Sequence, residues 1–140
     1  MSGMRACIDV DDVERAIAFY TGGLGLEVGR RFDDGWVELV GASIPLDLLR
    51  RPAGTAANPA ADAPRRDYRR HWTPVHLDFE VSDLDAAVER ARAAGATVEG
   101  DPRSFPWGRI ARLSDPFGHG FCLLEFRGLG YDELLGSESG

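Results

Sequence analysis

The sequence predicts an α+β fold of two pseudo-symmetric βαβββ modules, whose curved mixed sheets enclose a cleft and carry their helices on the outer faces. Three observations lead to this prediction. Apolar residues alternate with polar ones in strand-like segments, they recur at helical spacing between those segments, and this order returns about seventy residues later. The 140 residues divide into a first module, a linker, a second module and a flexible tail, at 1–51, 52–71, 72–127 and 128–140.

The first module contains four segments with strand character, over 4–10, 24–28, 36–40 and 44–49. A helix pattern lies between the first two of them. Asp11 or Asp12 can cap its start, because a carboxylate accepts hydrogen bonds from the free backbone amides of a first turn. Gly22 and Gly23 end the helix. Residues 32–35 end in Asp-Gly, which predicts a hairpin turn.

The second module repeats this order, with strands expected over 75–81, 96–98, 107–113 and 121–126. Its helix starts at a Ser82 or Asp83 cap and ends at Gly95. Residues 115–118, Asp-Pro-Phe-Gly, have the composition of a tight turn before the last strand. The linker at 52–71 has no periodicity, and its two arginine pairs could cover a cleft, contact an anionic ligand or remain solvated.

The two halves align at offsets of 71, 70 and 75 residues, which pair 10–16 with 81–87, 24–28 with 94–98 and 46–49 with 121–124. In each strong strand the apolar side would pack beneath the helix. The opposite sides carry mainly polar residues, namely Arg5, Asp9, Trp36, Glu38, Asp47, His76, Asp78, Glu80 and Arg112. These faces could be solvated, or the two sheets could curve together around a polar cleft. Trp36 and Trp107 favour the cleft, because an indole ring is costly to expose.

The composition restricts the partners of the protein. Its 23 acidic and 16 basic residues give a net charge of −7, which argues against nucleic acid as a partner, because phosphate binding needs a basic surface. No apolar run approaches the ~20 residues of a membrane span, and the first residues lack the features of a signal peptide. Cys7 and Cys122 make no disulfide framework. We therefore expect a cytoplasmic protein that contacts neither membranes nor nucleic acids.

Together these segments resemble the vicinal oxygen chelate superfamily, which includes glyoxalases, bleomycin-resistance proteins and extradiol dioxygenases. The matching stretches are 10–20, 24–26, 75–84, 95–96, 115–119 and 121–124. The ending Asp-Pro-Phe-Gly-His, followed by Phe-Cys-Leu-Leu, is similar to the glyoxalase-like subgroup. The resemblance implies one domain built from both modules, a cleft that binds a small molecule, and pairing of two copies into a homodimer.

The resemblance also implies positions for a metal site. Metal-binding members use one residue on the first and last strand of each module, and the corresponding residues here are Arg5, Asp47, His76 and Cys122. Arg5 is cationic and has no lone pair for coordination, so we expect no metal, with Arg5 paired to Asp47 or turned toward a ligand anion. His76, Asp47 and Cys122 could alternatively hold zinc with one open position. An enzyme of this superfamily would use a divalent metal such as Zn, Fe, Mn or Ni.

Two classes of function remain open. The first is metal-independent binding or sequestration of a drug or metabolite, in a cleft lined by Arg5, Trp36, Glu38, Asp47, His76, Trp107, Arg112 and Cys122. The acidic excess of the cleft face suits a cationic or mixed-charge ligand that stacks on Trp36 or Trp107. The second is a lyase, isomerase or dioxygenase, either metal-dependent or with His76 as general base and Arg5 stabilising an oxyanion. A noncatalytic partner-binding domain is a third alternative, with no residue pattern that points to it.

Overall fold

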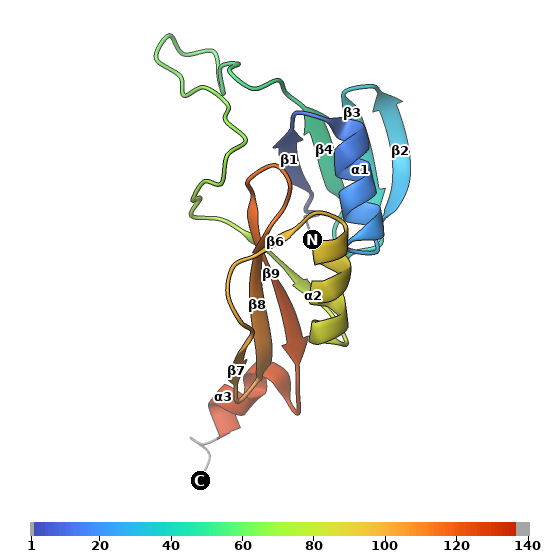
Figure 1. The fold of residues 1–140 in the computed structure, drawn as a ribbon, viewed down its shortest axis with the longest axis vertical. Helices are drawn as coiled ribbons and strands as arrows, with labels where there is room; N and C mark the ends of the chain where they lie inside the picture. Colours follow the sequence, from blue (N-terminus) through green and yellow to red (C-terminus); the bar gives the residue numbers. More distant parts are fainter. Residues whose placement is uncertain (1, 137–140) are drawn as a thin grey trace.

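Two β-sheets, each covered on one face by a helix, form the protein (Figure 1). The structure is a computed structural model that describes residues 2–136. In Figure 1 the first sheet and its helix lie above the second pair, and the green linker passes on the side away from the two helices. This arrangement confirms the predicted α+β fold of two modules. None of the helices within 2–136 has the length and apolarity needed to cross a membrane.

The first module has a mixed sheet in the order β1-β4-β3-β2, in which only the β1–β4 pair is parallel. Its strands are β1 at Ala6–Val10, β2 at Glu27–Asp33, β3 at Trp36–Val40 and β4 at Leu46–Arg50. Helix α1, at Val13–Gly22, connects β1 to β2. All four expected strands and the expected hairpin are present. Strand β2 extends further along the chain than predicted, because it pairs with β3 up to the turn.

The second module has the sheet order β5-β9-β8-β6, and the short strand β7 also pairs with β8. Its strands are β5 at Leu77–Glu80, β6 at Thr97–Val98, β7 at Arg103–Phe105, β8 at Gly108–Ser114 and β9 at Gly120–Phe126. Helix α2, at Leu84–Ala93, follows β5. Strands β6 and β7 together take the place that β2 has in the first module. Sequence reasoning missed β7, a three-residue segment between Pro102 and Pro106 with no room for an alternating pattern.

The parallel pairs β1–β4 and β5–β9 have the same register in the two modules. Cys7 lies opposite Asp47, and Asp78 lies opposite Cys122. These residues correspond through the sequence offsets of 71 and 75, so the repeat in the sequence is also a structural repeat. Each module therefore places one cysteine beside one aspartate, with the two residue types exchanged between the strands.

Both helices begin at the aspartates that the capping argument favours. Asp12 accepts a hydrogen bond from the backbone N–H of Arg15 at 3.0 Å, and Asp83 accepts one from Ala86 at 3.1 Å. At the other end of α1, the N–H of Gly23 donates to the carbonyl of Phe19. These contacts satisfy backbone groups that have no partner within the helix.

One apolar core runs through both modules. It consists of residues from α1, α2 and the covered faces of both sheets, including Val10, Ala16, Phe19, Val37, Leu39, Leu48, Leu84, Ala91, Leu113, Phe121 and Leu123. Each fully buried large side chain contributes about 1.5–3 kcal/mol relative to exposure. Because the core is shared, the two modules form one domain.

The chain after β9 contains short helical turns. Residues 130–132 form a 3₁₀ helix and Glu133–Gly136 forms α3, although we expected a loose tail here. The tail is held in part by Tyr131, whose ring lies 5.1 Å from that of Trp107 and 4.8 Å from that of Phe126. Residues 137–140 of the expected tail lie outside the described part of the chain.

Candidate functional site

The first of two polar clusters lies on the face of the first sheet that α1 does not cover. Arg5 donates from Nε to Asp47 Oδ2 at 3.0 Å and from Nη2 to Asp47 Oδ1 at 2.8 Å. The same Nη2 lies 2.6 Å from Glu38 Oε2. Arg30 also binds Glu38, through Nε at 2.9 Å and Nη2 at 2.8 Å. The expected Arg5–Asp47 pair is therefore one part of a four-residue network, in which sequence reasoning had not placed Arg30.

Both carboxylates of this network are held in the ionised state. Hydrogen bonds from Arg30 and Arg5 lower the pKa of Glu38 to about 2. Hydrogen bonding to Arg5 is the main cause that lowers the pKa of Asp47. The side chains themselves are almost fully covered, with 5% of Glu38 and 2% of Asp47 exposed. Two guanidinium groups and two carboxylates balance, so the cluster is neutral and internally paired.

The Arg5–Asp47 pair occupies both metal positions that the resemblance assigns to the first module. Arg5 occupies one of them and holds both carboxylate oxygens of the other, Asp47. A guanidinium has five N–H donors and no acceptor, so it cannot coordinate a cation. The set Arg5, Asp47, His76 and Cys122 therefore does not fit a divalent ion.

An aromatic pair lies at the edge of the first cluster. The ring centroids of Phe32 and Trp36 are 4.1 Å apart, and the guanidinium carbon of Arg30 lies 5.3 Å from the Phe32 centroid. Both residues are partly open to solvent, with 44% of Phe32 and 40% of Trp36 exposed. Trp36 was predicted as a stacking surface for a ligand, and this role stays a prediction.

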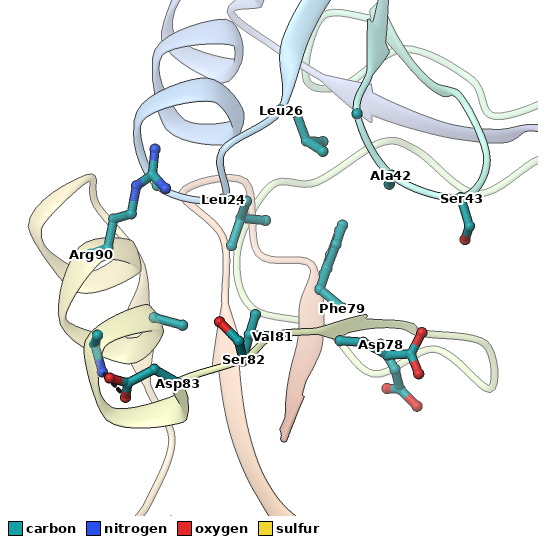
Figure 2. A pocket seen from close by; sticks show the side chains of 15 residues that line it. Leu24, Leu26, Ala42, Ser43, Asp78, Phe79, Val81, Ser82, Asp83 and Arg90 are labelled. Carbon is teal, nitrogen blue, oxygen red and sulfur yellow. Dashed lines mark hydrogen bonds between the residues drawn. The ribbon is translucent and has the colours of Figure 1, made fainter. Parts of the chain in front are cut away.

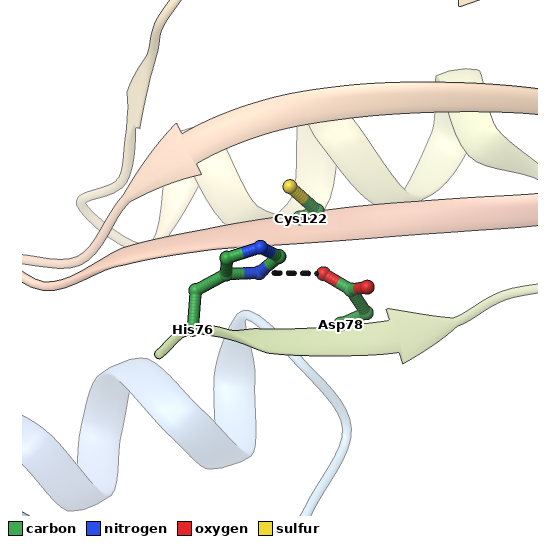
Figure 3. Close-up of side chains that lie close together, drawn as sticks. All are labelled: His76, Asp78 and Cys122. Atoms are coloured by element: carbon green, nitrogen blue, oxygen red, sulfur yellow. Dashed lines mark ion pairs between the residues drawn. The ribbon is translucent and has the colours of Figure 1, made fainter. Parts of the chain in front are cut away.

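The second polar cluster lies on the uncovered face of the second sheet (Figure 3). His76 Nδ1 is 2.9 Å from Asp78 Oδ1, and both side chains point from one face of the chain at β5 toward Cys122 on β9. The nitrogen, oxygen and sulfur atoms of these three residues lie within 4.8 Å of one another. The structure thus brings His76 and Cys122 together with Asp78, whereas Asp47 of the expected zinc set is not part of this group. Alternation had placed Asp78 on this face, two residues after His76, but not among the candidate ligands.

The thiol of Cys122 is protonated near neutral pH. Burial, followed by the nearby charge of Asp78, raises its pKa to about 11. Thiolate is the form that binds metals, so an ion at this cluster would have to displace the thiol proton. His76, Asp78 and Cys122 supply one donor of each kind, and together they form a group that could hold a metal.

The remaining predicted site residues, Arg112 and Trp107, lie in two different environments. Arg112 on β8 lies opposite Cys122 on β9, and together with His76 they line a hollow of about 220 Å³. Trp107 is only 9% exposed and stacks on Phe105, with 5.5 Å between the ring centroids. Its faces are occupied by neighbouring aromatic rings, whereas Trp36 remains accessible.

A larger hollow separates the edge strands β1 and β5, and we call it the inter-module hollow. Its volume is about 620 Å³. Arg5 and His76 both contribute to its wall, which connects the polar cluster of the first module to that of the second. The wall also contains His71 and His119, so all three histidines of the chain lie along this hollow.

A second hollow of about 600 Å³ lies on the helix side, between the end of α1, the β3–β4 turn and the start of α2 (Figure 2). Two of its charged groups, Asp83 and Arg90, are already engaged. Arg90 donates from Nε to the carbonyl of Gly22 at 2.8 Å, and the carboxylate of Asp83 caps α2. We therefore place the candidate site on the uncovered sheet faces and along the inter-module hollow.

Comparison with known proteins agrees with this architecture. A sequence model described as a glyoxalase-like domain matches residues 5–124. The anthracycline biosynthesis protein DnrV from Streptomyces peucetius is 34% identical over 161 residues, which cover 96% of this chain and 57% of DnrV. The chain thus spans little more than half the length of that relative.

Two solved structures illustrate the range of similar proteins. TnmS3, an antibiotic binding protein from Streptomyces sp. CB03234, gives a TM-score of 0.62 at 25% identity, covering 91% of this chain and 97% of TnmS3. The second is a mutant of the fosfomycin resistance protein FosX from Listeria monocytogenes, complexed with Mn(II) and 1S,2S-dihydroxypropylphosphonic acid. Its TM-score is 0.73 at 18% identity, and the match covers 99% of this chain and 98% of FosX. At that identity FosX is evidence for the fold alone.

Proposed function

The chain belongs to the glyoxalase-like domain family of the vicinal oxygen chelate superfamily, and from this premise we propose that it binds and sequesters a small molecule without a metal ion. The observation that carries the proposal is the ion-pair network of the first module. Arg5 stands at one metal position of the superfamily and binds both oxygens of Asp47, which stands at another. A cation placed there would be repelled by the guanidinium and would compete with it for the carboxylate.

The proposed ligand has a planar aromatic part and a cationic or mixed-charge part. The exposed faces of Phe32 and Trp36 offer a stacking surface beside the charged network. The net charge of −7 favours the approach of a cation. The names of two relatives support this ligand class, since DnrV is an anthracycline biosynthesis protein and TnmS3 an antibiotic binding protein. The site would comprise Arg5 and Trp36 with the neighbouring inter-module hollow.

We also propose that two copies pair, as the resemblance to the superfamily implies. Phe32 and Trp36 are large aromatic side chains that are exposed on the uncovered face of the first sheet. Exposed apolar surface of this kind supports the proposal that a ligand or a second copy covers this face. Sedimentation analysis at the concentrations used for ligand binding tests this part. A monomer at every concentration, with and without ligand, would remove it.

The test of the main proposal is a ligand titration of protein treated with a chelator. An anthracycline serves as the probe, and quenching of tryptophan fluorescence reports binding. We expect saturation at one ligand per chain, with the same affinity before and after chelation. Trp36→Ala and Arg5→Ala should each weaken binding, whereas Trp72→Ala, which removes an indole that is 82% exposed beyond the first module, should not.

Two outcomes would contradict the proposal. Binding that disappears on chelation and returns with a divalent ion would show that the ligand needs a metal. Unchanged affinity in both the Arg5→Ala and Trp36→Ala proteins would remove the proposed site. A further variant, His76→Ala, tells whether the second polar cluster also contacts the ligand, because His76 and Arg5 both line the inter-module hollow.

A second candidate function is favoured by the His76–Asp78 pair. Asp78 lies 2.9 Å from Nδ1 of His76 and would orient the ring so that Nε2 is free to accept a proton from a substrate. This is the metal-free enzyme alternative, with Arg5, which lines the same hollow, as an oxyanion partner. An enzyme that uses His76, Asp78 and Cys122 to hold a divalent ion is the metal-dependent form. Loss of turnover with retained ligand binding in Asp78→Asn and His76→Gln would support catalysis over sequestration.

A further inference from the structure

Two histidines outside both polar clusters face each other where the linker meets the second module. His71 ends the linker, and His119 lies in the turn between β8 and β9. His119 Nδ1 is 3.3 Å from His71 Nε2, and the two rings are nearly perpendicular at 88°. Neither residue was a candidate in the sequence, because 48 residues separate them and only the fold brings them together.

The outer nitrogen of each ring is bound to a backbone carbonyl. His119 Nε2 lies 2.7 Å from the carbonyl oxygen of Asp9, and His71 Nδ1 lies 2.9 Å from that of Arg69. A carbonyl oxygen only accepts hydrogen bonds, so both of these nitrogens must carry hydrogen. In a neutral imidazole the other nitrogen then carries a lone pair. Two neutral rings would therefore direct their lone pairs toward the same space, and either a metal ion between them or an added proton on one ring would relieve this repulsion.

We propose that His71 and His119 bind a divalent transition-metal ion such as Zn²⁺. Two nitrogen ligands on a tetrahedral zinc, at about 2.0–2.1 Å each, lie roughly 3.3–3.4 Å apart, which matches the separation of the two inner nitrogens. Histidine ligands of metals usually donate their other N–H to a carbonyl or carboxylate, as both rings do here. The tautomers that the carbonyls impose are thus the ones that coordination needs.

The site is held in place before any ion binds. The backbone N–H of His71 donates to the carbonyl of Gly118 at 3.3 Å, and the N–H of His119 donates to Asp115 Oδ1 at 2.9 Å. Gly118 has a φ of +82°, and a Cβ at this position would lie 2.3 Å from the carbonyl oxygen of Arg69. Glycine therefore permits the linker to pass close to the turn, and the rigid backbone presents both ligands.

The charges around His71 and His119 are compatible with a bound cation, because the nearby arginines are paired with carboxylates. Three arginines lie nearby in the linker, and each is neutralised by a carboxylate. Arg66 pairs with Asp9 at 2.7 Å, Arg69 with Asp67 at 2.6 Å and Arg70 with Glu99 at 2.6 Å. Both histidines line the inter-module hollow, which gives an ion and the waters in its remaining positions a route from solvent.

A bound ion would connect three parts of the fold. His71 belongs to the end of the linker, His119 to the second module, and the carbonyl that fixes His119 belongs to Asp9 of β1. The ion would thus close the linker against one end of the inter-module hollow. This site is separate from the superfamily metal positions, and its test contains no organic ligand, so its failure would leave the proposed small-molecule binding untouched.

The experiment is a titration of the full, chelator-treated chain with Co²⁺ and Zn²⁺. Cobalt distinguishes the two candidate sites, because an ion at His76, Asp78 and Cys122 would show a sulfur-to-cobalt charge-transfer band and an ion at the histidine pair would not. We expect one cobalt per chain without that band. His71→Gln should weaken binding by about tenfold or more, and the matched variant His76→Gln should bind as the original protein does.

Three results would overturn the proposal. Equal affinity in the original, His71→Gln and His119→Gln proteins would exclude the pair as the ligands. A charge-transfer band that disappears in Cys122→Ser would place the ion at the other cluster. Nitrogen-15 spectra of the imidazoles give the third such result. If the two rings carry three N–H hydrogens in total, and added metal does not change this number, then a shared proton takes the place of the ion. Circular dichroism of metal-free His71→Gln checks that the variant is folded.

Discussion

Arg5 and Asp47 form a two-point ion pair, with 3.0 Å between Arg5 Nε and Asp47 Oδ2 and 2.8 Å between Nη2 and Oδ1. Arg5 thereby binds both oxygens of a carboxylate that is only 2% exposed, and its Nη2 also reaches Glu38. Ion pairs among its own residues therefore hold the side chains on the uncovered face of the first sheet in place. We expect its stability to depend on Arg5, and the proposed ligand binding would depend on this residue as well.

Replacing Arg5 by glutamine should lower the melting temperature at neutral pH. The substitution leaves Asp47 ionised and covered with fewer hydrogen-bond donors, which is unfavourable for a buried acceptor. The matched control is Arg31→Gln, because Arg31 pairs with the exposed Glu14 and surface ion pairs contribute little. Calorimetry of the two variants checks this. A larger loss in Arg31→Gln than in Arg5→Gln would contradict the assigned role of the network.

The same network predicts how stability depends on acid. The pKa of Glu38 is about 2 in the folded protein and 4.5 as its ordinary value, so the unfolded chain binds a proton more readily between these pH values. Stability from Glu38 is then fully present above about pH 4.5 and is lost as the pH falls toward 2. Urea unfolding at several pH values should show a shallower decline across this window in Glu38→Gln. Parallel declines in both proteins would refute the assignment.

Tyr20→Phe tests the contact between α1 and the turn that precedes β9. The hydroxyl of Tyr20 donates to Asp115 Oδ2 at 2.5 Å, and both residues are buried. Removing the hydroxyl leaves a buried carboxylate oxygen without this donor and should cost about 1–3 kcal/mol of unfolding free energy. Tyr131→Phe, at a tyrosine that is 51% exposed, should cost much less when both variants are unfolded in denaturant.

The fold could be predicted because the alternation of polar and apolar residues in each segment is consistent with the order of strands and helices along the chain. Alternation defines one covered and one uncovered face in each strand. Arg5 directly precedes β1 and meets Asp47 on the adjacent parallel strand β4, because both side chains lie on the uncovered face. The burial of Trp107 could not be predicted, since it depends on Tyr131 in a segment with no periodic pattern.

Other parts of the site depend on tertiary contacts. The pairing of Arg30 with Glu38 requires the β2–β3 hairpin, in which the register shifts between Val28 and Arg31. Asp78 joins His76 and Cys122 because β5 and β9 are parallel and in register. A sequence gives the residue types and their faces, but such distances follow only from strand register and side-chain packing.

Asp83→Ala should destabilise α2 by about 0.5–2 kcal/mol, because Asp83 accepts a hydrogen bond from the N–H of Ala86 at the first turn. The equivalent Asp12→Ala should have a similar effect on α1, since the two caps occupy corresponding positions in the modules. Asp101→Ala, at an exposed position outside any helix or strand, is the control. Equal melting temperatures for all three variants would show that the caps contribute nothing measurable.

The two cysteines should differ in their rates of alkylation. Burial and a neighbouring aspartate raise the pKa of both thiols, but Cys7 is exposed, whereas Cys122 is buried and its pKa rises to about 11. At pH 8 roughly one Cys122 thiol in a thousand would be ionised, and the thiolate is the reactive form. Iodoacetamide labelling followed by peptide mass spectrometry should therefore modify Cys7 first. Asp78→Asn should speed the reaction of Cys122, because it removes a charge that disfavours the thiolate. Faster labelling of Cys122 than of Cys7 in the original protein would contradict the burial of this thiol in the second polar cluster.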